Sequence, residues 1–232
     1  MISVIIPLLN EGEGPLALIE ELTDTKGVEV ILVEGMGLEE DFQLLQNIPG
    51  ITLLQAQPPR SNQLNLGAQQ AKGEFLFFLH ADSTLPLGWT DEIQRLLSDP
   101  KIALGAFSFS IDRVGWAAKL YQGGANLRSR LLQLPYGDQG FFLTKEKFKQ
   151  MGGFEPIPIM EDYCLAKKAR HWGRVATSPL PIFTSARRYK NLGFFKSWLL
   201  NQIIIFRFRR GVDLTMLKRI YARDKGLKGK KS

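Results

Sequence analysis

The sequence holds a single cysteine, Cys164, and this scarcity is its first informative feature. One thiol cannot supply an intramolecular disulfide framework or a cysteine zinc site, and the count suits a reducing compartment. No apolar stretch reaches the roughly 18 residues that are needed to cross a bilayer. The chain also opens without a basic segment or a cleavage site, so we expect no signal peptide.

Two common phosphate-binding motifs are also missing. No Gly-x-Gly-x-x-Gly sequence opens the first expected helix, and no Walker Gly-Lys-Ser/Thr sequence occurs. These absences argue against dinucleotide-binding and P-loop proteins.

What is present is an ordinary globular composition with an uneven charge. The 232 residues are 44% hydrophobic and 23% charged, which suits one domain with a real core. Residues 187–232 hold 14 Lys and Arg against 2 Asp and Glu, whereas residues 1–186 hold 16 against 21. The basic character belongs to the tail, where it indicates either a solvated surface or an anionic partner.

Strands alternate with helices over about the first 85 residues. This alternation predicts an α/β protein with a parallel, doubly wound sheet and right-handed crossovers. The later pattern is less regular, and there we also expect a short strand that ends at Thr184 to Arg188. The expected strands are 2–9, 28–33, 51–54, 75–79, 103–111 and 141–144, and the expected helices are 15–23, 39–46, 61–71 (capped by Ser61), 87–98, 116–132, 145–151 and 160–172.

The central stretch is the apolar run 75–79, which ends abruptly in His80-Ala81-Asp82. A carboxylate at the carboxyl end of a central strand lies where open α/β sheets bind ligands, although Asp82 could also simply cap a turn. Polar residues follow the other early strands as well. Together they favour a nucleotide site, because carboxylates accept hydrogen bonds from ribose and Arg balances phosphate charge.

Seven ordered segments carry a resemblance to a known family. They are Ser3-Val4-Ile5-Ile6-Pro7 with Asn10-Glu11, Asn65-x-Gly67-Ala68 with Ala71-x-Gly73, Phe78-Leu79-His80-Ala81-Asp82, Gly124 to Arg130, Pro135 to Gly140, Met160-Glu161-Asp162, and Thr184 to Arg188. The chain resembles family-2 glycosyltransferases with the GT-A fold. It most resembles a compact bacterial subgroup that carries Leu-His-Ala-Asp where others have Asp-x-Asp.

The resemblance implies a GT-A type doubly wound, mixed but mostly parallel sheet in a single domain over residues 1–232. Residues 1–112 would form a Rossmann-like nucleotide-sugar-binding half, residues 113–190 an irregular acceptor and catalytic half, and residues 191–232 basic amphipathic C-terminal helices and a tail. The implied nucleotide-sugar contacts are Pro7, Asn10, Glu11, Glu34, Arg60, Asn65, His80, Ala81 and Asp82.

Asp82 matches the last Asp of the Asp-x-Asp motif, so the resemblance implies that it holds Mg²⁺ or Mn²⁺ against the donor diphosphate. A hard cation with oxygen ligands would stabilise the charge on the departing nucleoside diphosphate. His80 replaces the first Asp of that motif. An imidazole can ligate Mn²⁺ or a metal-bound water, and it can equally be a hydrogen-bonded structural residue.

Glu161 and Asp162 match the family's acidic pair at a helix start, where one carboxylate acts as general base in inverting enzymes. Displacement at the anomeric carbon needs a base opposite the leaving group, and we favour Asp162 over Glu161 for this role. The alternative is a carboxylate pair that merely suits a helix N-terminus.

Further residues are expected near the sugar or the acceptor. Asp138 and Gln139 lie in a glycine-flanked loop, and Arg187 and Arg188 match a basic pair that could bind phosphate. Turn capping and a solvated pair are the respective alternatives. Arg128 and Arg130 are two apart, so at most one should reach a site beside their helix.

The end of the second strand departs from the family pattern Asp-Gly-x-Ser-x-Asp. Here it reads Glu34-Gly35-Met36-Gly37-Leu38-Glu39, so the carboxylate gains a methylene and the Ser becomes Gly37. The sequence therefore defines how the base and the ribose are recognised less closely than it defines the fold.

The segment 198–210 is apolar with basic residues at its end. It is too short to span a bilayer, but it could lie in the interface with Arg207, Arg209 and Arg210 near anionic headgroups. The alternative is a core helix, and the two are compatible if its faces differ. A lipid or lipid-linked acceptor would follow from membrane contact.

We therefore predict a glycosyltransferase that moves a sugar from a nucleotide-sugar donor, with UDP-sugars favoured, to an unknown hydroxyl acceptor. We expect inversion, dependence on Mg²⁺ or Mn²⁺, no nucleic-acid partner, and a cytoplasmic location that includes the inner face of the cell membrane. The rivals are a membrane- or nucleic-acid-binding module, a catalytically degenerate relative, and a sugar nucleotidyltransferase. The acidic sequence after the first strand argues against the last of these.

Overall fold

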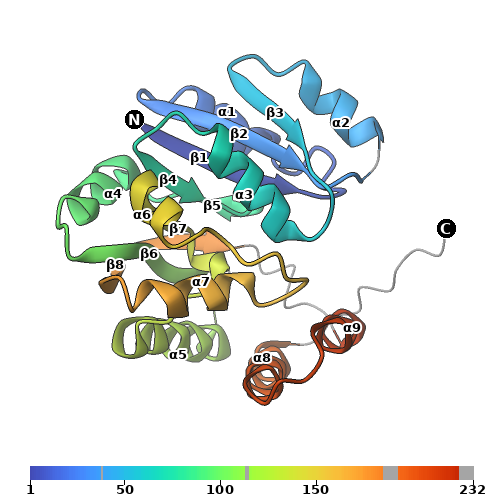
Figure 1. Cartoon of the computed structure of the whole chain (residues 1–232), viewed down its shortest axis with the longest axis vertical. Coiled ribbons are helices and arrows are strands. Elements are labelled where there is room, and N and C mark those ends of the chain that lie inside the picture. The colour runs from blue at the N-terminus through green and yellow to red at the C-terminus, as the bar shows by residue number, and fades with distance from the viewer. Residues whose placement is uncertain (38, 113–114, 185–192, 225–232) are drawn as a thin grey trace.

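The computed structural model describes residues 1–37, 39–112, 115–184 and 193–224, and Figure 1 shows the arrangement of their elements. Within these residues a single sheet has the strand order β3-β2-β1-β4-β7-β6-β8-β5. The strands are β1 (Ile2–Leu8), β2 (Val28–Glu34), β3 (Ile51–Gln55), β4 (Phe75–Phe78), β5 (Ser83–Thr84), β6 (Ile102–Ile111), β7 (Phe141–Thr144) and β8 (Arg174–Thr184).

The first half of the sheet is parallel, as the alternation of strands and helices predicts. Strand β1 pairs in parallel with β2 on one side and with β4 on the other, and β3 pairs in parallel with β2. The strands β1 and β4 are buried on both faces, which explains why their sequences are almost continuously apolar. This arrangement brings the carboxyl ends of β1, β2 and β4 to one edge of the sheet.

The second half is mixed. Strand β7 runs antiparallel to both β4 and β6, whereas β6 and β8 are parallel. The strand β8 is 11 residues long, so the expectation of one short strand here was wrong. Its Pro179 and Pro181 obscured the strand pattern, and the register with β6 shifts beside them, where proline is tolerated.

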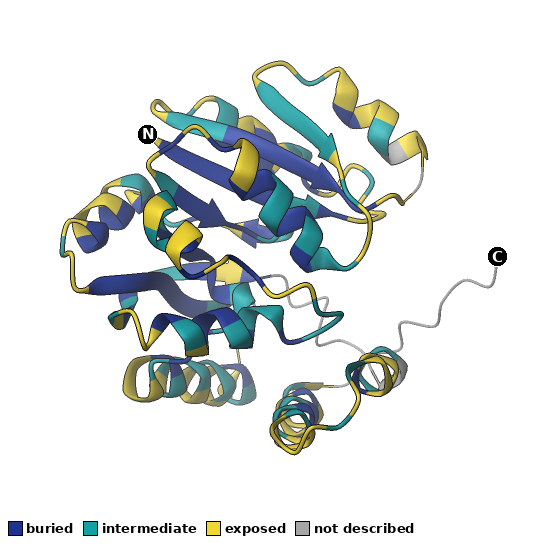
Figure 2. Ribbon diagram, viewed as in Figure 1, coloured by how far each residue is buried: buried dark blue, intermediate teal, exposed yellow. Residues whose placement is uncertain are grey.

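Helices cover both faces of this sheet (Figure 2). Residues of α1 (Leu16–Thr23) and α4 (Trp89–Leu97) pack into one core cluster with Ile6, and residues of α3 (Arg60–Gln70) and α7 (Glu161–Ala169) pack into a second cluster with Ile5. Successive residues of β1 thus enter opposite cores, as strand geometry requires. The remaining helices are α2 (Glu39–Gln46), α5 (Trp116–Leu132), the short 3₁₀ helix η1 (Gly137–Gln139), α6 (Lys145–Gln150), α8 (Gly193–Arg209) and α9 (Leu214–Asp224).

The motif that includes Asn65 and Gly67 holds α3 in place within the fold. The side-chain amide of Asn65 donates to the Phe154 carbonyl at 2.8 Å, and its oxygen accepts from the Phe154 N–H at 2.9 Å. A Cβ on Gly67 would lie 2.5 Å from the Ile5 side chain, so only glycine lets α3 lie this close to β1. The amide groups of Asn65 are thus used within the fold, and its contact with the nucleotide sugar stays a prediction.

The predicted cap of α3 was also wrong. The helix begins at Arg60, and the buried Ser61 does not cap it but donates to the Ile157 carbonyl at 3.5 Å.

The chain ends, within the described residues, in the helix pair α8 and α9. Leu200 and Ile204 of α8 and Leu217 of α9 are buried in the second core cluster. We expected C-terminal helices within residues 191–232, and α9 is one of them whose bounds were not predicted. Among the described residues, the helices are all too short or too polar to cross a bilayer.

Candidate active site

A cavity of about 300 Å³ opens between the second half of the sheet and the helix pair α8 and α9. It gathers five of the residues predicted from the sequence, which come from α3, the end of β4, the η1 loop and the start of α7. They are Arg60, His80, Asp138, Glu161 and Asp162. Ile204 and Ile205 of α8 supply apolar wall, so the cavity is polar on the sheet side and partly apolar opposite.

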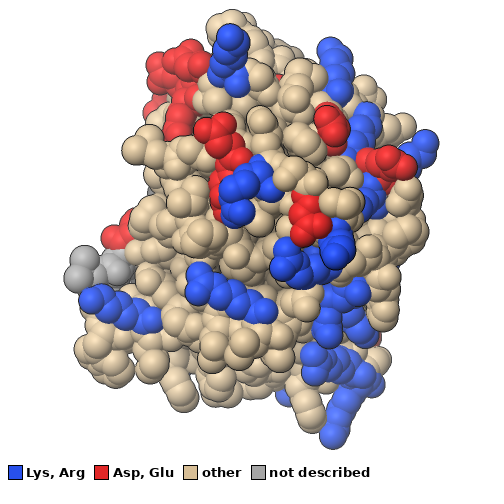
Figure 3. Space-filling view, turned by 90° about the vertical axis from the view of Figure 1, so that its left-hand side faces the viewer, with Lys and Arg blue, Asp and Glu red and all other residues tan. Residues whose placement is uncertain are grey.

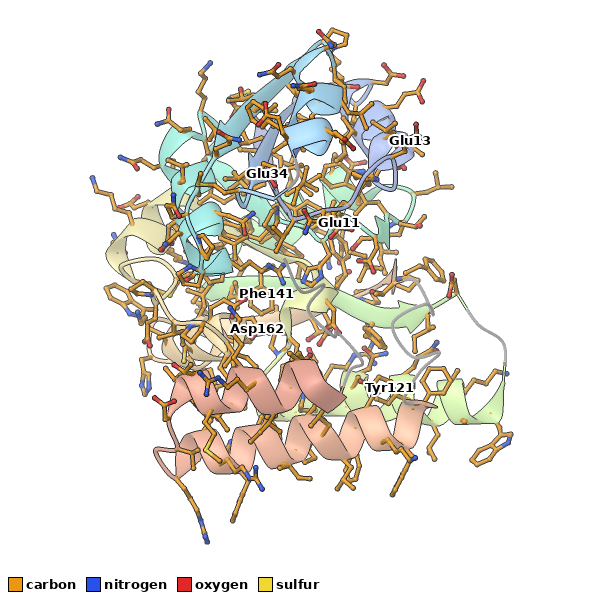
Figure 4. All side chains as sticks on the ribbon, turned by 90° about the vertical axis from the view of Figure 1, so that its right-hand side faces the viewer. Glu11, Glu13, Glu34, Tyr121, Phe141 and Asp162 are labelled. Carbon is orange, nitrogen blue, oxygen red and sulfur yellow. The ribbon has the colours of Figure 1, made fainter. Side chains whose placement is uncertain are left out.

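Glu161 and Asp162 open helix α7, and their placement depends on the residue before them. Met160 has a left-handed backbone with φ of 74°, which turns the chain sharply into the helix. Asp162 Oδ2 accepts the Gly137 N–H at 2.8 Å, and its Oδ1 accepts the Tyr163 N–H at 2.7 Å. In the view of Figure 4, Asp162 lies nearer to helices α8 and α9 than Glu11 and Glu34 do, which come from the ends of β1 and β2.

The surroundings of Glu161 shift the pKa of its carboxyl. Burial raises the pKa of its carboxyl above the usual value, and the neighbouring charge of Asp162 raises it further. Arg60 and Lys218, which line the same cavity, oppose this shift. A carboxylate whose pKa moves toward neutrality is suited to accept a proton near pH 7.

The η1 loop beneath the cavity is held by a stacked arginine. The guanidinium of Arg128 lies 3.4 Å from the ring centroid of Tyr136 and donates to the Leu134 carbonyl at 3.0 Å. Burial raises the pKa of the Tyr136 hydroxyl to about 12, so this group stays protonated and faces the cavity as a hydrogen-bond donor. Arg130 donates instead to Ser108 at 3.1 Å, so only Arg128 of the two lies beside the site.

Gln139 is wholly buried in this loop, and its expected contact with sugar or acceptor stays a prediction. Its side-chain amide donates to the Phe107 carbonyl at 2.9 Å and to Ser129 Oγ at 3.2 Å. Its oxygen accepts from the Tyr136 N–H at 3.2 Å. The side chain is therefore a structural support for the loop that carries Asp138.

His80 and Asp82, which share the Leu-His-Ala-Asp motif, face different spaces. A Cβ on Gly137 would lie 3.4 Å from His80 Nε2 and 3.3 Å from Asp162 Oδ2, so the imidazole lies on the side of the acidic pair. Asp82 and Ala81 line a second hollow of about 540 Å³, together with Asp112 and the start of α1.

A divalent cation requires oxygen ligands, and Asp82 fits that requirement. Among the described residues no cluster of three or more His, Cys, Asp or Glu side chains is arranged to hold a metal. Mg²⁺ sites in phosphate-transferring proteins commonly use one or two carboxylates and complete the shell with substrate oxygens and water. The half-buried carboxylate of Asp82 at the strand end suits such a site, whereas His80 faces away from it.

The ends of β1 and β2 are arranged differently from expectation. Glu34 is 2% exposed, and its carboxylate accepts the N–H groups of Met36 at 2.6 Å and Gly37 at 2.7 Å. The side chain holds its own loop in this way, and its role as a nucleotide contact stays a prediction. Asn10 and Glu11 are exposed after β1, and Pro7 is half-buried within it.

Two predictions lie outside the described residues. Arg187 and Arg188 fall in residues 185–192, so their contact with phosphate stays a prediction.

Several lining residues were missed from the sequence. Tyr121 of α5, Asn201 of α8, and Lys218 and Tyr221 of α9 all face the first cavity. The apolar spacing of Leu214, Leu217 and Tyr221 is helical and could have revealed α9. Nothing local distinguishes Tyr121 or Asn201, because their place in the site depends on how helices pack.

Comparison with known structures defines the class of protein. The fold is similar to that of the mannosyltransferase PcManGT from Pyrobaculum calidifontis, solved in complex with GDP-Man and Mn²⁺, with a TM-score of 0.65. The match covers 96% of this chain and 68% of that one at 19% sequence identity, which establishes a GT-A fold and nothing finer. No curated protein matches the chain.

The family follows from the sequence itself. The model of Glycosyl transferase family 2 matches residues 3–152. The chain belongs to this family and is a glycosyltransferase.

Proposed function

We propose that the protein transfers a sugar from a nucleoside-diphosphate donor to an acceptor hydroxyl with inversion at the anomeric carbon. The observation that carries this proposal is the Glu161–Asp162 pair at the start of α7, which faces a cavity large enough for part of a substrate. Membership of the family supports glycosyl transfer.

The acidic pair supplies the base. As the acceptor oxygen attacks the anomeric carbon from the face opposite the diphosphate, its proton passes to a carboxylate of Glu161 or Asp162. The bond from the anomeric carbon to the phosphate oxygen breaks, and the nucleoside diphosphate leaves with the electron pair. Proton transfer to a positioned carboxylate contributes about 10²- to 10⁴-fold to the rate.

Asp82 is proposed to hold Mg²⁺ or Mn²⁺ against the donor diphosphate. A cation bound there would stabilise the negative charge that develops on the leaving phosphate. The Mn²⁺ in the PcManGT complex supports dependence on a divalent cation. Arg60 lies at the start of α3 and lines the first cavity, where it would add positive charge near anionic groups of the substrate.

We also propose candidates for the base of the donor nucleotide and for the acceptor. The family resemblance favours UDP-sugars, whereas the GDP-Man in the PcManGT complex makes GDP-mannose an equal first candidate. The apolar wall that α8 gives the cavity is consistent with a lipid or lipid-linked acceptor.

Calorimetric titration with UDP and GDP, each with and without Mn²⁺, tests the donor site. We expect metal-dependent binding of one nucleotide, lost in Asp82→Ala and retained in Asp91→Ala, which removes an exposed carboxylate of α4. Absence of binding for both nucleotides in the presence of metal would refute the proposal. Binding that survives Asp82→Ala unchanged would refute the role of Asp82 alone.

A further inference from the structure

Helix α5 packs against the sheet through polar side chains, where a surface helix usually presents apolar ones. Asn126 Oδ1 accepts the Phe109 N–H at 2.7 Å, and the Asn126 amide donates to the Phe109 carbonyl at 3.0 Å. Ser129 shares a hydrogen bond of 2.6 Å with Thr177 of β8. These contacts explain the unusual polar residues in the helix, because they give hydrogen-bond partners to the main-chain groups of Phe109 and to the Thr177 hydroxyl.

The opposite side of α5 is apolar and exposed. Trp116, Leu120, Leu127 and Leu131 are between 59% and 80% exposed. Their spacing of four, seven and four residues places them along one side of the helix. A surface helix normally turns such a row inward, so this one requires a covering partner.

Helix α8 adds a second exposed apolar row beside the first. Tyr121 of α5 and Phe194 of α8 make a ring contact at 5.9 Å, which brings the two helices together. Phe195, Leu199 and Phe206 are exposed on α8, while its Leu200 and Ile204 are buried. The two rows form what we call the α5–α8 surface, consisting of Trp116, Leu120, Leu127, Leu131, Phe195, Leu199 and Phe206.

The charge on these two helices has one sign. Together they carry Lys119, Arg128, Arg130, Lys196, Arg207 and Arg209 and no Asp or Glu. The lower part of the molecule in Figure 3 accordingly shows Lys and Arg among uncharged side chains, with no acidic residue in view.

We propose that the α5–α8 surface docks on a bilayer of anionic phospholipid. Exposed leucines and aromatic rings would enter the interface, and Lys119, Lys196 and Arg207 would lie among the headgroups. The charge argues against a second copy of the chain as the occupant, because a two-fold interface would place two surfaces of the same positive charge face to face. The proposal concerns binding and does not depend on the catalytic assignment.

Docking in this orientation would also bring the cavity to the membrane. The inner side of α8 contributes Ser197, Asn201 and Ile204 to the cavity wall, so one helix separates the cavity from the proposed lipid. This consequence rests on the proposed function, and it provides a route for an acceptor hydroxyl carried by a lipid.

Sedimentation with vesicles tests the docking, using phosphatidylglycerol in phosphatidylcholine against phosphatidylcholine alone, without donor or metal. We expect binding to the anionic vesicles that weakens with salt. Lys119→Gln/Lys196→Gln/Arg207→Gln should weaken it by about 100-fold, at roughly fivefold for each charge near the surface. Leu127→Ser/Leu131→Ser should weaken it by at least about 10-fold.

Controls keep the outcomes distinct. Leu87→Ser removes an almost fully exposed leucine outside both helices and should leave vesicle binding unchanged. Thermal unfolding verifies that each variant is folded. Failure to bind anionic vesicles, or binding that neither multiple variant weakens, would overturn the proposal, as would a stable dimer that Leu127→Ser/Leu131→Ser dissociates. Asp82→Ala should bind vesicles normally, so a failed catalytic assignment leaves this result intact.

Discussion

The carboxylate of Glu34 fills the space that a side chain at position 37 would occupy. Its Oε1 accepts the Gly37 N–H at 2.7 Å, and a Cβ on Gly37 would lie 2.8 Å from that same atom. Asn10 Oδ1 would lie 2.3 Å from the Cβ on the other side. The longer side chain of Glu34 thus occupies space that the glycine at position 37 leaves empty. The two departures from the family pattern in this loop therefore have one structural explanation.

This pairing predicts a compensating double variant. Gly37→Ser should destabilise the protein by about 1–3 kcal/mol through overpacking against the buried Glu34. Glu34→Asp shortens the carboxylate, so the double variant should recover part of the loss. Urea unfolding of the two single variants and the double variant measures the coupling. Strictly additive losses would show that the two positions are independent.

Gln139 should behave as a structural residue. Gln139→Ala leaves the buried Phe107 carbonyl without its amide donor and should cost about 1–3 kcal/mol of stability. Thermal unfolding measures this, with the exposed Gln94→Ala as a matched control. A stable Gln139→Ala variant with a raised KM would instead favour the contact with substrate that the sequence suggested.

Glu92 of α4 should make the protein sensitive to acid. A two-pronged hydrogen bond from Arg95, at 2.7 and 2.8 Å, lowers the pKa of its carboxyl, and Ser178 Oγ donates to it at 2.7 Å. A lowered folded pKa gives stability that is present above the ordinary value of 4.5 and is lost as pH falls through the folded value.

The test is Glu92→Gln. Because Arg95 is mostly exposed, we expect a loss of only about 1 kcal/mol at pH 7. The difference from wild type should shrink in urea unfolding below pH 4. The exposed neighbour Asp91→Asn should show no such dependence, and a loss for Glu92→Gln that is constant with pH would contradict the assigned ion pair.

The sequence predicted what local pattern determines. The apolar runs of β1 and β4 indicate buried strands, and the polar residues that follow these strands point to the site. Glu161, at the start of α7, was identified through the family motif. The hydrogen bonds that Asn65, Glu34 and Gln139 make within the fold were not predicted, for a common reason. Each is a polar side chain near the site that satisfies main-chain groups of distant or irregular segments, and no local pattern distinguishes such a residue from a ligand. Lys218 was missed because the bounds and the packing of its helix were not predicted.

The acidic pair gives the sharpest test of the mechanism, because Glu161 should show opposite effects on activity and stability. Burial and Asp162 raise its pKa, so the folded protein favours the protonated carboxyl. The stability that this proton confers is fully present below the ordinary value of 4.5 and is lost as pH rises through the folded pKa. Glu161→Gln removes the ionisation and should therefore unfold at a higher temperature than wild type at pH 7, with a difference that disappears near pH 4.

If Glu161 takes the acceptor proton, the same variant should lower kcat by about 10²- to 10⁴-fold, and the acid limb of the wild-type rate profile should titrate with a pKa above 4.5. If Asp162 is the base, as the family match favours, Asp162→Asn should carry that loss, and Glu161→Gln should mainly shift the pH profile by removing a neighbouring charge. Thermal unfolding and rate profiles of both variants across pH 4–8 separate the two. Full activity in both variants would show that the pair only caps α7.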